Sequence, residues 1–238
     1  MWKGNKVSVV IPAYNEEETI AAVVGAFKKN EYVDEVLVVN NNSKDRTDEE
    51  ARSAGARVVL ETNPGYGNAL RRGMEDAEGE IMVLTEADGS FSAGDVVKFL
   101  AYIEDAGMVI GTRTTRQMLG QGARMNFIIR LANIGVAKLF ELFWFFTNET
   151  RFSDVGCTYR ALWKSTYRQI RAGLTATGPE FSPEMMAEVI RCRIKVIEIP
   201  VRYGPRLGGE SQHSGTYFKL TRTALKMLRV LVRKKFGM

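Results

Sequence analysis

The chain is poor in the residues that build disulfide frameworks and histidine-based metal centres. It has two cysteines, Cys157 and Cys192, and one histidine, His213. Neither cysteine lies in a CxxC or other metal-ligand spacing, and a single histidine cannot form a His-based zinc site. We therefore interpret the cysteines as reduced, partly buried thiols of a cytoplasmic protein.

Long uncharged apolar runs are also missing. The most apolar stretch, residues 125–146, contains Arg130, Lys138 and Glu141, whereas a membrane-spanning helix needs about 20 residues with few or no charges. Residues 1–6 run directly into an apolar, strand-like stretch and lack the pattern of a signal peptide. We expect neither a spanning helix nor a signal peptide.

Hydrophobic residues and positive charge are what the chain does have. Hydrophobic residues make up 45% of the 238 positions, enough to bury the core of one large domain. The formal net charge of +5 suits nucleic acid, anionic lipid or phosphorylated ligands equally well. The basic C-terminal segment lacks interleaved aromatics and a known nucleic-acid-binding motif, so we expect no nucleic-acid partner.

Short apolar runs alternate with segments of helical spacing along the first half of the chain. We predict strands at 7–11, 36–39, 58–60, 81–84 and 108–110, and helices at 16–29, 47–54, 68–77 and 96–106. Repeated βα units of this kind form an α/β domain with a Rossmann-like, mostly parallel sheet flanked by helices. The second half is less regular, with predicted helices at 125–146, 183–191 and 217–236 and strands at 157–162 and 196–199.

Polar loops follow the predicted strands, and ligands of parallel sheets bind beyond the carboxyl ends of the strands. We therefore expect these loops to share one cleft. In one of them, Glu86 and Asp88 are two positions apart and point the same way in an extended chain. Carboxylates suit Mg²⁺ or Mn²⁺ that also binds a diphosphate; a simple polar turn is the alternative interpretation.

Four segments, taken in order, resemble the motifs of family-two glycosyltransferases. They are VVIPAYNEE at 9–17, VNNNSKDRT at 39–47, NPGYGNA at 63–69 and EAD at 86–88. The resemblance is closest to polyprenol-phosphate glycosyltransferases of the dolichol-phosphate mannose synthase type, and it covers nearly the whole chain. It implies a GT-A fold, a divalent metal and a nucleoside-diphosphate sugar donor.

The resemblance also implies residues that bind the donor and the metal. Asn41 stands where the family usually has Asp, and because an amide both donates and accepts, it slightly favours UDP over GDP, unless it only caps the following turn. The implied metal contacts are Glu86, Asp88 and Ser90, with ribose or sugar as the alternative contact of Glu86. The implied nucleoside contacts are Pro12, Ala13, Tyr14, Glu16, Val39, Asn41 and Ala87.

Arg113 and Arg206 are the implied partners of the diphosphate, because a guanidinium presents a fork that matches phosphate oxygens. Residues 206–212 resemble the family's RxxGxSK loop, which implies that Ser211 and Gln212 also contact the donor. Gln212 stands in place of the usual lysine, and His213 would partly compensate for the lost charge.

Residues 154–160 resemble the family's segment near the acceptor. A sugar hydroxyl acceptor needs Asp154 as general base, whereas a phosphate monoester has a second pKa of about 6 and is already a dianion near neutral pH. For a lipid phosphate, Asp154 would instead orient Arg160 or a sugar hydroxyl. The remaining acceptor candidates are Arg124 and Arg130, for the phosphate, and Glu184 and Glu188, for the sugar unless they lie on a solvated helix face.

The C-terminal segment predicts a basic amphipathic helix, so we divide the chain into a glycosyltransferase domain at 1–216 and a helix at 217–238. Such a helix can lie on anionic lipid, or dock on the core with a solvated basic face. The helix at 125–146 either lies in the headgroup region or is a core or subunit-contact helix. The basic stripe is formed by Lys219, Arg222, Lys226, Arg229 and Arg233.

We expect an inverting, metal-dependent transfer of a hexose to a polyprenyl phosphate, at the cytoplasmic face of a membrane; the family implies the inversion. One alternative is a soluble sugar or protein acceptor with Asp154 as base. Another is a nucleotide-binding, membrane-associated module without turnover, indicated by departures from the family pattern at Asn41, Ser90 and Gln212.

Overall fold

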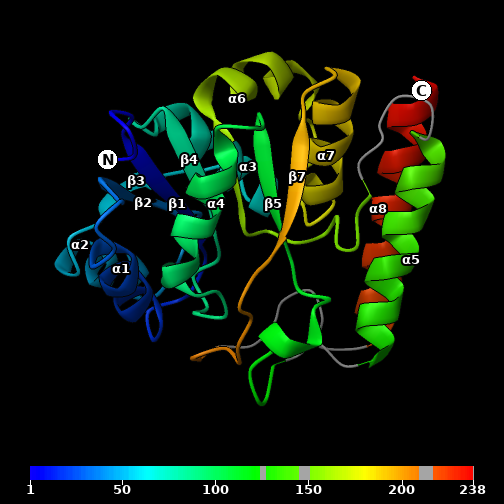
Figure 1. Ribbon diagram of the computed structural model, residues 1–238. Helices are drawn as coiled ribbons and strands as arrows, with labels where there is room; N and C mark the ends of the chain where they lie inside the picture. Colours follow the sequence, from blue (N-terminus) through cyan, green and yellow to red (C-terminus); the bar gives the residue numbers. More distant parts are fainter. Residues whose placement is uncertain (124–126, 145–150, 209–216, 238) are drawn as a thin grey trace.

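One twisted sheet runs through the protein (Figure 1). The structure is a computed structural model that describes residues 1–123, 127–144, 151–208 and 217–237. The strands follow the order β3-β2-β1-β4-β6-β5-β7. They are β1 (Val7–Ala13), β2 (Glu35–Asn40), β3 (Arg57–Leu60), β4 (Ile81–Leu84), β5 (Met108–Thr112), β6 (Arg160–Trp163) and β7 (Val196–Pro200).

The direction of β6 decides which loops meet. β6 is antiparallel to both of its neighbours, β4 and β5, whereas the other neighbouring strands pair in parallel. Residues just before β6 therefore reach the edge of the sheet at which the other strands end. We call this edge the carboxyl edge; it lies at the bottom of Figure 1.

Helices cover both faces of the sheet (Figure 1). α3 (Tyr66–Asp76) packs against β1 and β2, and α4 (Val96–Ile103) packs against β5, β6 and β7. The close approach of α3 requires a glycine, because a Cβ at Gly73 would stand 2.3 Å from Cγ1 of Val10. The other short helices are α1 (Ile20–Lys28), α2 (Thr47–Ser53), α6 (Lys164–Ile170) and α7 (Phe181–Arg191).

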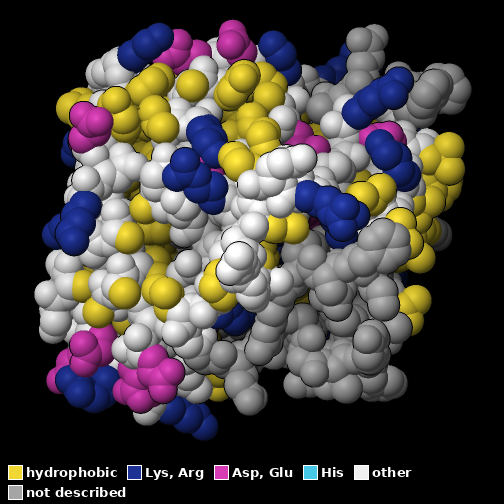
Figure 2. Space-filling model, turned by 60° about the horizontal axis from the view of Figure 1, so that its bottom comes forward, with side chains coloured by type: hydrophobic (Ala, Val, Ile, Leu, Met, Phe, Trp, Pro, Cys, Tyr) yellow, Lys and Arg dark blue, Asp and Glu magenta, His cyan; other side chains and the backbone are white. Residues whose placement is uncertain are grey.

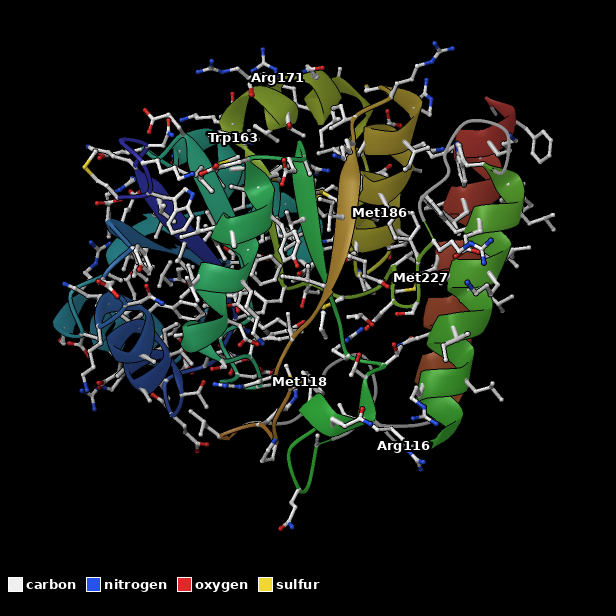
Figure 3. All side chains as sticks on the ribbon, in the orientation of Figure 1. Arg116, Met118, Trp163, Arg171, Met186 and Met227 are labelled. Carbon is white, nitrogen blue, oxygen red and sulfur yellow. The ribbon has the colours of Figure 1, made fainter. Side chains whose placement is uncertain are left out.

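Two longer helices, α5 (Phe127–Phe143) and α8 (Tyr217–Phe236), lie side by side beyond α7 (Figure 1). α8 packs on α7 through the fully buried Leu231, and Met227 points from α8 toward the body of the protein (Figure 3). None of the described helices combines the length and the apolar character that crossing a bilayer requires.

The predicted α/β architecture with a mostly parallel, helix-flanked sheet is confirmed. α6 was missed, because seven residues give too short a pattern to reveal a helical period. The strand predicted at 157–162 starts only at Arg160. Both cysteines are free, but only Cys157 is buried; Cys192 is exposed, which corrects the expectation that both are partly buried.

Candidate active site

Charged side chains from four strand ends meet at the carboxyl edge. Glu86 and Asp88 follow β4, Arg113 follows β5, Asp154 precedes β6 and Arg206 follows β7. Ion pairs join Arg206 to Asp88 and Arg113 to Asp154. The structure thus brings together predicted metal and phosphate contacts that are far apart in the sequence.

Asp88 lies in a turn that main-chain hydrogen bonds hold in place. Its Oδ1 accepts the amide of Ser90 at 2.9 Å, and its carbonyl accepts the amide of Leu207 at 2.9 Å. The carbonyl of Ser90 accepts the amide of Gly204 at 2.8 Å. These bonds fasten the turn to the segment around Arg206 and fix that residue beside Asp88.

Two buried oxygens of this turn, Oδ2 of Asp88 and Oγ of Ser90, have no hydrogen-bond partner among the residues that the structure describes. Nη2 of Arg206 lies 3.1 Å from Oδ2, at ion-pair distance but without hydrogen-bond geometry. Buried polar atoms without partners are rare in proteins, and oxygens of this kind suit Mg²⁺ or Mn²⁺. Asp88 and Ser90 therefore fit the predicted metal.

Protein side chains alone do not complete a metal site here. Among the residues that the structure describes, no group of three or more His, Cys, Asp or Glu is arranged to hold an ion. Mg²⁺ commonly takes one or two carboxylates and completes its shell with substrate phosphates and water. The arrangement suits an ion that arrives with a diphosphate.

Glu86 differs from Asp88 in its surroundings. Its Oε1 accepts the hydroxyl of Thr158 at 2.8 Å. Burial raises the pKa of Glu86 to about 7, the negative charge of Asp88 adds to this effect, and Arg113 opposes it. The Glu86 carboxyl group is held toward Thr158 and is partly protonated, so it is a weaker metal ligand than Asp88. A contact of Glu86 with the metal or the sugar stays a prediction.

Arg113 and Asp154 form a bidentate ion pair. Nε of Arg113 donates to Oδ2 at 2.7 Å and Nη2 donates to Oδ1 at 2.9 Å. The Arg113 amide donates to Oδ2 as well, at 3.2 Å, and its guanidinium lies 5.5 Å from the ring centroid of Tyr203. Because Asp154 is fully buried and both its oxygens are engaged, it orients Arg113 and not Arg160.

Glu198 and Tyr203 belong to the site, although sequence reasoning missed them. Glu198, on β7, accepts the amides of Ser153 and Asp154 at 3.0 Å each. Burial raises the pKa of Glu198, while these hydrogen bonds oppose the rise. A lone carboxylate in the otherwise apolar strand VIEIP is a signal that could have found Glu198; Tyr203 lies outside the recognised motifs.

The loop after β1 carries the predicted nucleoside contacts. Pro12 is half-buried, Ala13 is buried and Tyr14 is exposed. Asn15 takes a left-handed conformation, with φ 54°, and the chain then turns back to the half-buried Glu16. Burial raises the pKa of Glu16, a hydrogen bond from Thr19 opposes this, and the charge of Asp88 adds to it. Glu16 therefore lies near the predicted metal site.

Asn41 holds a loop in place and does not present its amide to a base. Its Nδ2 donates to the carbonyls of Glu61 at 3.0 Å and Asn63 at 2.8 Å. Its Oδ1 accepts the amide of Gly65 at 2.7 Å. The preference for UDP that we based on this amide is therefore not supported by the structure.

Two other predicted nucleoside contacts are buried. Val39 is fully buried in β2, and a Cβ on Gly73 of α3 would stand 2.9 Å from its Cγ2. Its side chain faces the core, so a nucleotide contact of Val39 would have to come from the main chain. Ala87 is 3% exposed, and its predicted ribose contact would have to come from the main chain.

Arg160 is also buried, and its donors go to main-chain carbonyls. Nε donates to the carbonyl of Cys157 at 3.2 Å, and Nη1 to that of Ser182 at 3.1 Å. Burial lowers the pKa of Arg160. Arg160, which we expected Asp154 to orient beside the acceptor, instead supports the loop before β6 through its buried guanidinium.

Glu184 and Glu188 face neither a sugar nor solvent. Both are buried on α7 and form ion pairs with Lys234 of α8. Both interpretations of these residues are corrected: they anchor α8. The residues Arg124, Ser211, Gln212 and His213, and the boundary predicted at 216, lie outside the described residues.

Comparison with known proteins identifies the family of the chain. Residues 8–164 match the model of glycosyl transferase family 2, a range that includes Glu86, Asp88, Arg113 and Asp154. An uncharacterized glycosyltransferase of Mycobacterium tuberculosis is 30% identical over 215 residues, which cover 90% of this chain and 92% of the relative. A dolichyl-phosphate beta-glucosyltransferase of Trichomonas vaginalis is 25% identical and covers 95% of this chain and 73% of its own length.

Solved structures share the fold. Glucosyl-3-phosphoglycerate synthase of Mycobacterium tuberculosis, in complex with Mn²⁺, uridine diphosphate and phosphoglyceric acid, superposes with a TM-score of 0.75 at 19% identity, covering 98% of this chain and 79% of the synthase. The same synthase with Mg²⁺ and uridine diphosphate gives a TM-score of 0.75 and covers 99% and 80%. The expected GT-A fold is confirmed.

These findings favour an enzyme over a nucleotide-binding module without turnover. The paired charges at the carboxyl edge, the family match and the shared fold agree with the resemblance of the four motifs. The chain belongs to glycosyl transferase family 2 and is a glycosyltransferase that uses a nucleotide sugar.

Proposed function

We propose that this enzyme transfers a hexose from a nucleoside-diphosphate sugar to a polyprenyl phosphate, while bound to the cytoplasmic face of an anionic membrane. The observation that carries the proposal is the outward surface of α8, which exposes large apolar side chains between cations. It supports a lipid-borne acceptor better than a freely diffusing one.

The outward surface of α8 has an apolar ridge formed by Leu225, Val232 and Phe236. Spacings of seven and four residues place them along one line of a helix, on the side away from Leu231 and Lys234, which dock α8 on α7. Leu225 is 66% exposed and Phe236 is 64% exposed. Exposed side chains of this size, aligned along a helix, are typical of interfacial helices.

Exposed cations flank the ridge on both sides, and no acidic residue follows position 210 in the sequence. Lysine and arginine near anionic lipid are each worth about 1 kcal/mol. On neighbouring α5, Leu131 and Leu142 are exposed as well; Figure 2 shows hydrophobic and basic side chains along the edge of the molecule where these helices lie. The flanking cations are Lys226, Arg229, Arg233 and Lys235.

Both helices start near the carboxyl edge and run away from it (Figure 1). Arg116 and Met118, in the segment that leads from β5 to α5, also lie at this edge (Figure 3). A lipid surface along α5 and α8 would hold the phosphate of a polyprenyl chain beside the site.

The contacts of Asp154 favour an acceptor that needs no general base. Arg113 engages both carboxylate oxygens, so the contacts of Asp154 assign it to holding this guanidinium. A phosphate monoester is largely dianionic at neutral pH and can attack the anomeric carbon directly, with inversion. Arg113 and Arg206 would stabilise the departing diphosphate, and a divalent ion on Asp88 would add positive charge there.

Our choice of a uridine nucleotide is supported by structural relatives and not by Asn41. The neighbouring synthase was solved with uridine diphosphate and with Mn²⁺ or Mg²⁺, which supports a UDP-sugar and a divalent metal in this enzyme. The same synthase was solved with phosphoglyceric acid, so a soluble phosphorylated acceptor is the second candidate. The two candidates differ in their need for a membrane.

Transfer assays on vesicles can separate the two acceptors. Polyprenyl phosphate in anionic vesicles should accept label from a UDP-hexose, whereas phosphoglyceric acid should not. Leu225→Ser should weaken vesicle binding and transfer on vesicles, but leave transfer to detergent-solubilised polyprenyl phosphate intact. Leu60→Ser, at a side chain of β3 that is 55% exposed, is the control for loss of an exposed apolar side chain and should have no effect. Label that appears only in phosphoglyceric acid would refute the lipid acceptor.

A further inference from the structure

Arg206 places a positive charge on the carboxylate that a metal ion would use. Nη2 of Arg206 lies 3.1 Å from Oδ2 of Asp88, and this oxygen is buried without a hydrogen bond from the described part of the chain. Burying a carboxylate without a nearby cation is costly. The guanidinium thus supplies, in the unliganded protein, the charge balance that a divalent ion would otherwise provide.

The main chain on both sides of Arg206 is fixed to the Asp88 turn. Leu207 donates its amide to the carbonyl of Asp88, and Gly204 donates to the carbonyl of Ser90. The Leu207 side chain also packs over Gly89, where a Cβ would stand 2.5 Å from its Cδ1. Arg206 can therefore leave Asp88 through rotation of its own side chain, without movement of the backbone.

We propose that Arg206 is a placeholder cation: it neutralises Asp88 in the unliganded enzyme and transfers to the diphosphate when the donor arrives, which frees Asp88 for the metal. The proposal rests on the proposed donor and metal, and is independent of the acceptor. A divalent ion and a guanidinium compete for the same oxygen, so the metal alone should bind weakly and the metal with diphosphate should bind well.

Binding of Mn²⁺ without nucleotide, measured by electron paramagnetic resonance, tests this competition. Arg206→Gln removes the guanidinium that competes with the ion for Oδ2 of Asp88 and should tighten Mn²⁺ binding about tenfold, which corresponds to about 1.4 kcal/mol. The same variant should weaken binding of uridine diphosphate in saturating Mn²⁺. Arg202→Gln removes an equal charge from an exposed position in the same segment and should change Mn²⁺ affinity less than about twofold.

Displacement of the side chain can be observed directly in the unmodified protein. The Nε–H signal of Arg206 in ¹⁵N-arginine spectra can be assigned because it is absent from the spectrum of Arg206→Gln. As Mg²⁺ alone is added, this signal should shift, and the shift should reach its limit when the metal site is saturated. An unchanged Mn²⁺ affinity in Arg206→Gln would overturn the proposal. So would an Arg206 Nε–H signal whose chemical shift does not change in saturating Mg²⁺. Neither measurement uses an acceptor, so failure of polyprenyl transfer would leave both results unaffected.

Discussion

Replacing Lys234 with methionine tests how α8 is held on the protein. Nζ of Lys234 lies 3.2 Å from Oε1 of Glu184 and 2.8 Å from Oε1 of Glu188, and it donates to the carbonyl of Gly173. The Lys234 side chain is only 8% exposed, and both carboxylates are buried. Methionine has a similar volume but leaves the two carboxylates without this cation.

The loss can be bounded from the remaining contacts. Removing one partner of a buried ion pair costs about 3–5 kcal/mol. Glu184 keeps the amides of Thr175 and Ala176, and Glu188 keeps Arg191, so we expect the lower end, about 3 kcal/mol. In a chain of this length, each kcal/mol lowers the Tm by about 2–4 °C, which gives a fall of about 6–12 °C.

Urea and thermal unfolding, followed by circular dichroism, measure this change. Lys226→Met removes the same charge from an exposed position of α8 and should stay within about 0.5 kcal/mol of the parent protein. Adding Glu184→Gln and Glu188→Gln to Lys234→Met should restore part of the loss. A Lys234→Met protein within about 1 kcal/mol of the parent would refute the anchoring role.

Three further experiments test the cysteine thiols, the turn around Asp88 and the predicted general base. Thiol labelling at mildly alkaline pH should modify the exposed Cys192 and spare Cys157, because burial raises the pKa of Cys157 to about 12; equal labelling of both in the folded protein would contradict this. Gly89→Ala should destabilise the protein by about 1–2 kcal/mol in urea unfolding, because its φ is +73° and a leucine side chain fills the space. Gly135→Ala, at an open helical position, is the control and should be stabilising or neutral. Asp154→Asn should lower kcat without changing the shape of the pH profile of kcat/KM, because the carboxylate orients a guanidinium; loss of an acid limb in the variant would identify it as a general base.

The sequence predicts most of the sheet and the residues of its carboxyl edge. Continuous apolar runs such as the one in β1 locate buried parallel strands, and the loops after them hold Glu86, Asp88 and Arg113. The reversed direction of β6 leaves no mark in the pattern, because a short buried strand reads the same in either direction. The sequence pattern therefore does not predict that Asp154 pairs with Arg113.

The wrong predictions share a physical cause. Asn41, Arg160, Glu184 and Glu188 are polar residues that become buried only when distant parts of the chain pack around them, so the sequence pattern alone cannot show that they are buried and satisfied. The sequence pattern likewise could not show which side chains of α8 are buried against the protein. Its docked face includes Lys234, while part of its apolar surface is exposed.

Transfer of label to the lipid fraction tests the central claim most directly. The protein, Mg²⁺ or Mn²⁺ and a panel of labelled nucleotide sugars are incubated with polyprenyl phosphate in anionic vesicles, and the lipid extract is counted. We predict labelled lipid with at least one UDP-hexose, and none when polyprenol without phosphate replaces the acceptor. Absence of labelled lipid with every donor, in a preparation that binds uridine diphosphate, would contradict the account.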